Sequence, residues 1–165
     1  MFILLTSAPD PQEPRASRLA ALLRRHGPVF TVSTAPRSAG FEGEADSLAA
    51  MLRRLVETHP PKFLFALDSA AARPITSLGC LKSIPWVLCH APSSAWTEHS
   101  IDAAFRAREL WLDAGSKTLP RELRPRAVAR PSAPEAAAWV ERRLKKLSAL
   151  PRRAASPYPQ TRLVI

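Results

Sequence analysis

Two apolar runs in this chain each end in a polar residue that could take part in acid–base chemistry. Residues 63–67 (FLFAL) are followed by Asp68, and residues 84–89 (IPWVLC) by His90. A carboxylate or a neutral imidazole can take a proton from a substrate hydroxyl near neutral pH. Asp68 with Ser69 also suits a structural role, because such residues cap the helix that follows a strand. Both roles stay open for Asp68, and His90 is open between a functional role and a plain turn.

The segments around these two residues alternate between strand and helix. Short apolar runs predict strands at 2–6, 29–33, 63–67, 84–89, 109–113 and 126–129. Helical spacing predicts helices within 13–26, 45–59, 72–83, 100–108 and 132–150, with Gly27 just past the first and Ser100 as the cap of the fourth. This alternation predicts an α/β fold with a doubly wound, mostly parallel Rossmann-like sheet and helices on both faces.

A parallel sheet brings the carboxyl ends of all its strands to one edge, where α/β proteins bind their ligands. We therefore expect Asp68 and His90 at that edge as candidate catalytic residues. Cys89 and Asp113 belong to the same edge. The residues expected to bind substrate there are Thr6, Ser7, Thr34, Ser69 and Ser116.

Several classes of site lack their sequence signatures. No GxGxxG follows the first strand, and no GxxxxGK[ST] or GxSxG occurs, which disfavours dinucleotide enzymes, P-loop enzymes and serine hydrolases. Cys80 and Cys89 form no CxxC pair, so we expect no metal site. We expect both to be free thiols in a reducing compartment. The start MFILLTSAP lacks the pattern of a signal peptide, and no apolar run is long enough to span a membrane, so we expect a cytoplasmic protein.

The net charge of +10 is concentrated toward the C-terminus. Residues 121–153 hold 10 Lys or Arg against 3 Asp or Glu. Helical spacing in the last helix places Trp139, Val140, Leu144 and Leu147 toward the core and Arg142, Lys145 and Lys146 on the opposite side. A solvated basic face explains these cations, and so does an anionic surface. Nucleic acid is disfavoured because no nucleic-acid-binding motif accompanies them, which leaves contact with acidic lipid at the inner membrane face.

The order of motifs resembles the N-terminal lobe of a GT-B glycosyltransferase, an enzyme family with two Rossmann-like lobes. The similar stretches are ILLTS, LLRRHG, VFTVSTAP, IPWVLCHAP, LWLDAGSKTLPREL and RAVARPSAPEAAAW, and they cover most of residues 1–150. One departure is the loop APDPQEP after the first strand, because the family often has a Gly pair there.

The resemblance implies an acceptor-binding lobe over 1–150, with 151–165 as a linker and the start of a missing second lobe. The donor, a nucleotide sugar, would be bound by that second lobe or by a separate subunit, so this chain alone would bind no cofactor and would not be catalytic. The acceptor would be a glycan or a lipid-linked sugar, with Asp68 and His90 lining the cleft. The alternative is a non-catalytic Rossmann-like binding or scaffold protein, so the sequence leaves open whether the chain is an enzyme.

Overall fold

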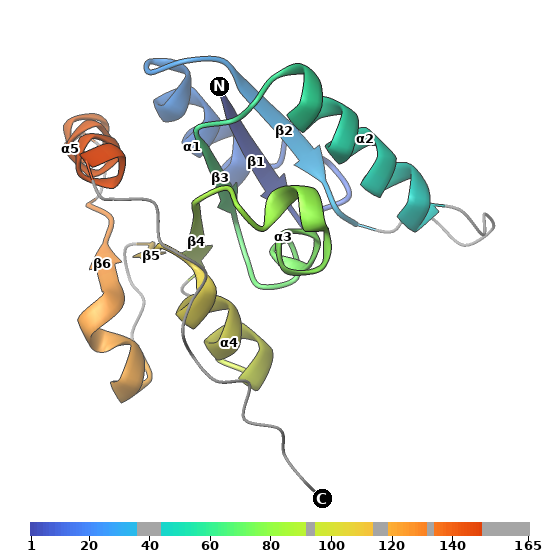
Figure 1. Ribbon diagram of the computed structural model, residues 1–165. Helices are drawn as coiled ribbons and strands as arrows, with labels where there is room; N and C mark the ends of the chain where they lie inside the picture. The colour runs from blue at the N-terminus through green and yellow to red at the C-terminus, as the bar shows by residue number, and fades with distance from the viewer. Residues whose placement is uncertain (36–43, 92–94, 114–118, 132–133, 150–165) are drawn as a thin grey trace, which may run out of the picture.

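Six short apolar runs form the strands of one sheet in the computed structural model, which describes residues 1–35, 44–91, 95–113, 119–131 and 134–149 (Figure 1). The strands are β1 (Phe2–Thr6), β2 (Val29–Ser33), β3 (Phe63–Ala66), β4 (Trp86–His90), β5 (Glu109–Leu112) and β6 (Ala127–Ala129). Every residue of β1, β3, β4 and β5 is buried, as expected for strands covered on both faces.

All five strand pairings are parallel, and the strand order is β2-β1-β3-β4-β5-β6. The predicted doubly wound Rossmann-like α/β fold is therefore confirmed. The order contains the 2-1-3-4-5 arrangement of one common doubly wound fold, in which the chain changes direction between β1 and β3. The carboxyl ends of β1 and β3 consequently flank the switch point, where folds of this kind place their ligands.

Helices cover the sheet in two layers (Figure 1). The helices are α1 (Pro14–Arg24), α2 (Glu44–Thr58), α3 (Arg73–Ser77), α4 (Glu98–Arg106) and α5 (Ala136–Ala149), with 3₁₀ turns η1 (Gly79–Leu81) and η2 (Arg121–Arg126). One core joins α1 and α5 to the side chains of Phe2, Phe65 and Trp111. The other joins α2, α3 and α4 to the alternate residues of the same strands, such as Ile3 and Leu64. Both faces of the sheet are thus covered by helices. Ligands can therefore approach the sheet at the two edges where the strands begin and end.

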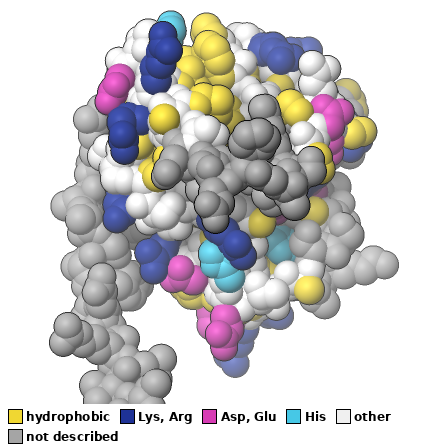
Figure 2. Space-filling view, turned by 90° about the vertical axis from the view of Figure 1, so that its right-hand side faces the viewer, with side chains coloured by type: hydrophobic (Ala, Val, Ile, Leu, Met, Phe, Trp, Pro, Cys, Tyr) yellow, Lys and Arg dark blue, Asp and Glu magenta, His cyan; other side chains and the backbone are white. Residues whose placement is uncertain are grey.

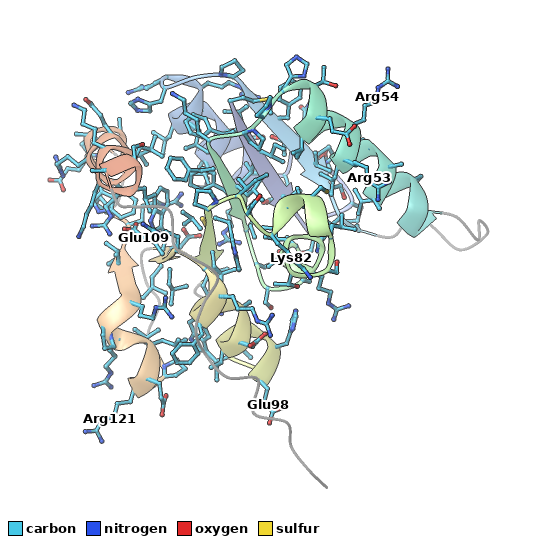
Figure 3. The ribbon with its side chains drawn as sticks, in the orientation of Figure 1. Arg53, Arg54, Lys82, Glu98, Glu109 and Arg121 are labelled. Atoms are coloured by element: carbon cyan, nitrogen blue, oxygen red, sulfur yellow. The ribbon has the colours of Figure 1, made fainter. Side chains whose placement is uncertain are left out.

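The start of β5 is tied to α5 by a buried ion pair. Glu109, seen beside α5 in Figure 3, accepts hydrogen bonds from Arg143 and from Nε1 of Trp111. The Trp111 ring meets Trp139 edge-on, with 4.8 Å between ring centroids. The predicted apolar stripe of α5 is confirmed, because Val140, Leu144 and Leu147 are buried and Trp139 packs against the same core.

Three sequence-based expectations for the helices differ from the structure. The single helix expected at 72–83 is divided into α3 and η1, with Leu78 in extended conformation between them. Ser100 does not cap α4; the cap is Thr97, which exchanges hydrogen bonds with Ser100 three residues on. The sequence predicts Gly27 directly past the end of the first helix, whereas that helix ends at Arg24 with Arg25 as its cap, so Gly27 lies further along the chain. Its φ of +150° is a conformation that favours glycine. The sequence SAPE at 132–135 also predicts a capping box for the last helix, and its Ser132 lies outside the described residues.

The described surface carries only a few large exposed apolar side chains. Phe30, Met51 and Phe105 are the most exposed of them, and they belong to three different elements, β2, α2 and α4. On the face that carries α2, hydrophobic side chains alternate with Lys and Arg (Figure 2). None of the three lies at the carboxyl ends of β1, β3 and β4, so they are separate from the candidate site.

Candidate functional site at the sheet switch point

The strand register places Ser7, Asp68 and His90 in one row across three neighbouring strands. Leu5 of β1 is level with Ala66 of β3, and Ala66 is level with Leu88 of β4. Two residues further along each strand direction, the same row reaches Ser7, Asp68 and His90. Neighbouring strands lie roughly 4.8 Å apart, so these side chains are near neighbours on the face of α2, α3 and α4. The predicted pair therefore lies at the same edge of the sheet, on neighbouring strands, and Ser7 contacts Asp68.

Ser7 and Asp68 make a direct contact across the switch point. The Ser7 hydroxyl donates to Oδ2 of Asp68 at 2.6 Å. Oδ1 of the same carboxylate accepts from the backbone N–H of Ala71 at 2.8 Å. Asp68 thus does stabilise the turn that follows β3, and one of its oxygens also holds a hydroxyl at the site. Asp68 is half-buried, so the carboxylate still borders solvent.

His90 is enclosed, and its ring stacks on an aromatic side chain. The residue is 3% exposed, and its imidazole lies parallel to the Trp96 indole with 3.7 Å between ring centroids. Among the described residues, neither ring nitrogen has a hydrogen-bond partner of normal geometry. Trp96 was not predicted as a site residue, because only the folded chain brings it over His90.

Burial and a nearby cation keep His90 neutral. Burial lowers the pKa of His90 below its ordinary value of 6.5, and the positive charge of Arg15 lowers this pKa further. The Ala91 backbone and the carboxylates of Asp113 and Asp68 oppose that shift without reversing it. The ring is therefore an uncharged base at neutral pH, and both of its nitrogens are buried.

Arg15 connects the carboxyl ends of three strands, β3, β4 and β5. Its guanidinium donates to the carbonyl of Leu67 at 2.6 Å, to the carbonyl of Cys89 at 2.9 Å and to Asp113 at 2.6 Å. Arg130, which follows β6, forms an ion pair with the other oxygen of Asp113 at 2.9 Å. Asp113 was expected at this edge, but Arg15 was missed. A signal existed, since Arg15 lies four residues before Leu19 and eight before Leu23, on the buried face of α1.

The N-terminus of α1, which follows β1, is occupied by the chain itself. Glu13 caps this helix, and its side chain accepts from the backbone N–H groups of Arg15 and Ala16 at 3.0 and 2.9 Å. These are the donors that a phosphate would use at a helix start after the first strand. The capping carboxylate therefore competes with any phosphate at this position.

The other predicted site residues have mainly structural contacts. Thr6 is buried, and its hydroxyl oxygen accepts from the N–H of Ala8. The hydroxyl of Thr34 donates to the Thr6 carbonyl at 3.2 Å, and the carbonyl of Ser69 lies 3.1 Å from Nε2 of His99. Ser116 lies outside the described residues.

The described part of the chain gives little support for thiol or metal chemistry. Cys80 and Cys89 are free thiols, and burial raises the pKa of Cys89 to about 12. Cys89 is therefore protonated at neutral pH and a poor nucleophile.

The described residues contain no group of three or more His, Cys, Asp and Glu side chains placed to hold a metal ion. Within the same ranges, every helix is too short or too polar to cross a lipid bilayer.

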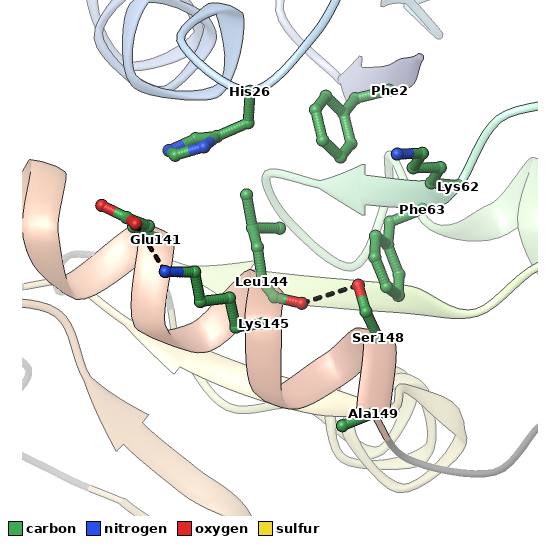
Figure 4. Close-up of a pocket in the computed structure, with 9 residues that line it drawn as sticks. All are labelled: Phe2, His26, Lys62, Phe63, Glu141, Leu144, Lys145, Ser148 and Ala149. Carbon is green, nitrogen blue, oxygen red and sulfur yellow. Dashed lines mark hydrogen bonds and ion pairs between the residues drawn. The ribbon is translucent and has the colours of Figure 1, made fainter.

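A hollow lies at the opposite edge of the sheet, where the strands begin (Figure 4). This depression has a volume of about 470 Å³. Its lining is Phe2, His26, Lys62, Phe63, Glu141, Leu144, Lys145, Ser148 and Ala149. The predicted cations Arg142, Lys145 and Lys146 are all exposed on α5, and Lys145 reaches the depression while paired to Glu141 at 2.8 Å. The structure therefore separates these cations from the row of Ser7, Asp68 and His90.

Comparisons with protein-family models, with curated proteins and with solved structures found no match to this chain.

Proposed function

We propose that this chain is the acceptor-binding lobe of a two-lobed glycosyltransferase, and that the acceptor sugar binds at the switch point. The observation that carries the proposal is the row of Ser7, Asp68 and His90 at the carboxyl ends of β1, β3 and β4. Asp68 borders solvent and can accept a hydrogen bond from a sugar hydroxyl, with Ser7 as its neighbour. In an inverting reaction the same carboxylate is placed to take the proton of the attacking hydroxyl.

The assignment of this lobe to the acceptor rather than the donor rests on Glu13. A nucleotide sugar carries a diphosphate, and the helix N-terminus best placed to bind it is already capped. The donor would accordingly be held by a second lobe or subunit, and the chain by itself would not transfer sugar. Positioning of both reactants supplies much of the rate in such reactions, and one half of a cleft positions only one of them.

The first test is acceptor binding by the chain and by Asp68→Asn. The probes are maltose, lactose and chitobiose, with binding followed through the NMR amide signals of Ser7, Asp68 and Ala71. Asn keeps an oxygen for the Ala71 N–H, so the turn should survive. The loss of a charge-assisted hydrogen bond, about 1.5–3 kcal/mol, should weaken sugar binding roughly tenfold or more.

The matched control is Asp102→Asn, which removes an exposed carboxylate paired with Arg106 on α4. This control should bind sugar like the unmodified chain. If Asp68→Asn also binds all three sugars unchanged, Asp68 is a cap only and the proposed site is wrong. Efficient transfer from UDP-glucose or GDP-mannose by the purified chain would overturn its assignment as the acceptor half. If the chain binds sugar, and addition of a separate donor-binding lobe or subunit gives no transfer, a non-catalytic binding protein is favoured instead.

A second candidate function is contact with an anionic lipid surface through the depression beside α5. Lys62 and Lys145 stand at its rim, while Phe2, Phe63 and Leu144 form an apolar base (Figure 4). The Lys145–Glu141 pair is exposed, and such pairs contribute only about 0–1 kcal/mol, so Lys145 is readily available to an anion. The volume lies in the range of small-molecule sites, which suits a single phosphate-bearing headgroup rather than a long polyanion.

A further inference from the structure

We propose that Arg15 is the positioning residue of the candidate site: its one guanidinium fixes Asp68 and His90 relative to each other. The importance of this role rests on the proposed function, but the experiment that tests it requires no sugar binding. Arg15 donates to the carbonyl of Leu67, the residue before Asp68, and to the carbonyl of Cys89, the residue before His90. The two strand ends that carry the candidate catalytic residues are therefore held by the same planar group.

The third bond of Arg15 extends this tie to the rest of the sheet edge. Nε donates to Asp113, which follows β5, and Asp113 also pairs with Arg130 after β6. The Asp113 backbone N–H donates to the carbonyl of His90 at 3.2 Å, so the β5 end also bonds directly to the candidate residue. The side chains of Arg15 and Asp113 are 19% and 12% exposed, which shields these bonds from water. The guanidinium holds its donors in one plane at fixed directions, whereas a lysine ammonium is a compact charge whose donors rotate.

The position of Arg15 has an electrostatic consequence that a purely structural contact would lack. Its charge lowers the pKa of His90, whereas the charge of Asp113 raises the same pKa. Removal of one or the other charge should therefore move His90 in opposite directions. Such opposite shifts are expected when the two charges act directly on His90, whereas a general loss of stability would not give shifts of opposite sign.

The experiment is an NMR titration of the His90 imidazole in the full chain and in four variants. Arg15→Met should raise the titration midpoint of His90 toward 6.5, and Asp113→Asn should lower it. Arg15→Lys keeps the charge and loses the fork, so the midpoint should change little while hydrogen exchange at the Leu67 and Asp113 amides becomes at least tenfold faster. The matched control is Arg143→Met, which removes an arginine of similar burial from the Glu109 pair at the far edge and should leave His90 unchanged.

An unchanged His90 midpoint in folded Arg15→Met would overturn the proposal. If Arg15→Met does not fold, Arg15→Lys decides, because unchanged amide exchange in that variant refutes the tie between the strand ends. A shift of His90 in Arg143→Met equal to that in Arg15→Met would also refute it, since the effect would then be general loosening. If these tests succeed but the chain binds no sugar, the role of Arg15 is supported and the proposed function is wrong.

Discussion

His90 is a buried titratable side chain, and neither of its ring nitrogens has a hydrogen-bond partner of normal geometry among the described residues. Its protonation at low pH therefore destabilises the fold. The unfolded chain carries this histidine with a pKa near 6.5, and burial next to Arg15 lowers the pKa in the folded state. Between the two pKa values the unfolded chain binds more protons than the folded chain. Stability from this source is therefore full above the unfolded pKa and declines as the pH falls through 6.5.

We expect the free energy of unfolding to fall as the pH drops from 7.5 to 5.5, with a contribution from His90 of at most about 1.4 kcal/mol per pH unit. His90→Phe keeps a ring against Trp96 and removes the proton site, so its stability should depend less on pH over this interval. Urea unfolding of both chains across the range measures the difference. Parallel curves for the two proteins would show that His90 contributes nothing to acid sensitivity.

The helix α1 illustrates how one element both supports the sheet and defines the site. Its buried residues Ala16, Leu19 and Leu23 pack on the sheet, and Arg15 on the same face reaches the strand ends. Its cap residue Glu13 closes the helix start with a carboxylate. The same helix therefore places a carboxylate where a phosphate would bind and a guanidinium on the carbonyls of two strand ends.

Glu13→Ala should cost about 1 kcal/mol of stability, the usual effect of losing a capping side chain. It should also free the N–H groups of Arg15 and Ala16, so that added sulfate stabilises the variant more than the unmodified chain. Thermal unfolding in sulfate and in chloride at equal ionic strength measures this. Glu98→Ala, at the start of α4 where Thr97 provides the cap, is the control and should gain no sulfate dependence. Equal stabilisation of all three proteins by sulfate would contradict the competition that we infer.

Much of this architecture follows from local sequence, and much of the site does not. The continuous apolar runs of β1, β3 and β4 predict buried parallel strands, and Asp68 and His90 follow from their positions at the strand ends. The Ser7–Asp68 bond depends on β1 lying beside β3, which the strand order alone decides. The stacking of Trp96 on His90 depends on where the chain returns after β4. Arg15 could have been found from its helical spacing, since a cation on a buried face requires partners.

At the scale of the whole molecule, the two edges of the sheet differ in charge. Asp68 and Asp113 balance Arg15 and Arg130 at the carboxyl edge, where we place the acceptor. The segments 25–28, 59–62 and 82–85, which enter β2, β3 and β4 at the other edge, contain Arg25, Lys62 and Lys82 and no acidic residue. Lys82 is seen on this connection in Figure 3. Helix C-termini account for part of this pattern, because cations such as Arg24 and Lys146 in a last turn offset the helix dipole. Lys62 belongs to no helix, so this explanation does not cover it.

This difference predicts a polarised interaction with anionic membranes, through the depression beside α5. We expect the chain to bind vesicles of phosphatidylcholine mixed with phosphatidylserine and to ignore vesicles of phosphatidylcholine alone. Each cation near such a surface contributes about 1 kcal/mol, so Lys62→Glu with Lys145→Glu should weaken binding by roughly 30-fold or more. The matched control is Arg18→Glu with Arg73→Glu, which changes the net charge by the same amount through exposed residues outside the depression. Cosedimentation of the three proteins with both kinds of vesicle measures the effect. Equal losses in the two double variants would mean that net charge alone attracts the chain, and the depression would then have no role of its own.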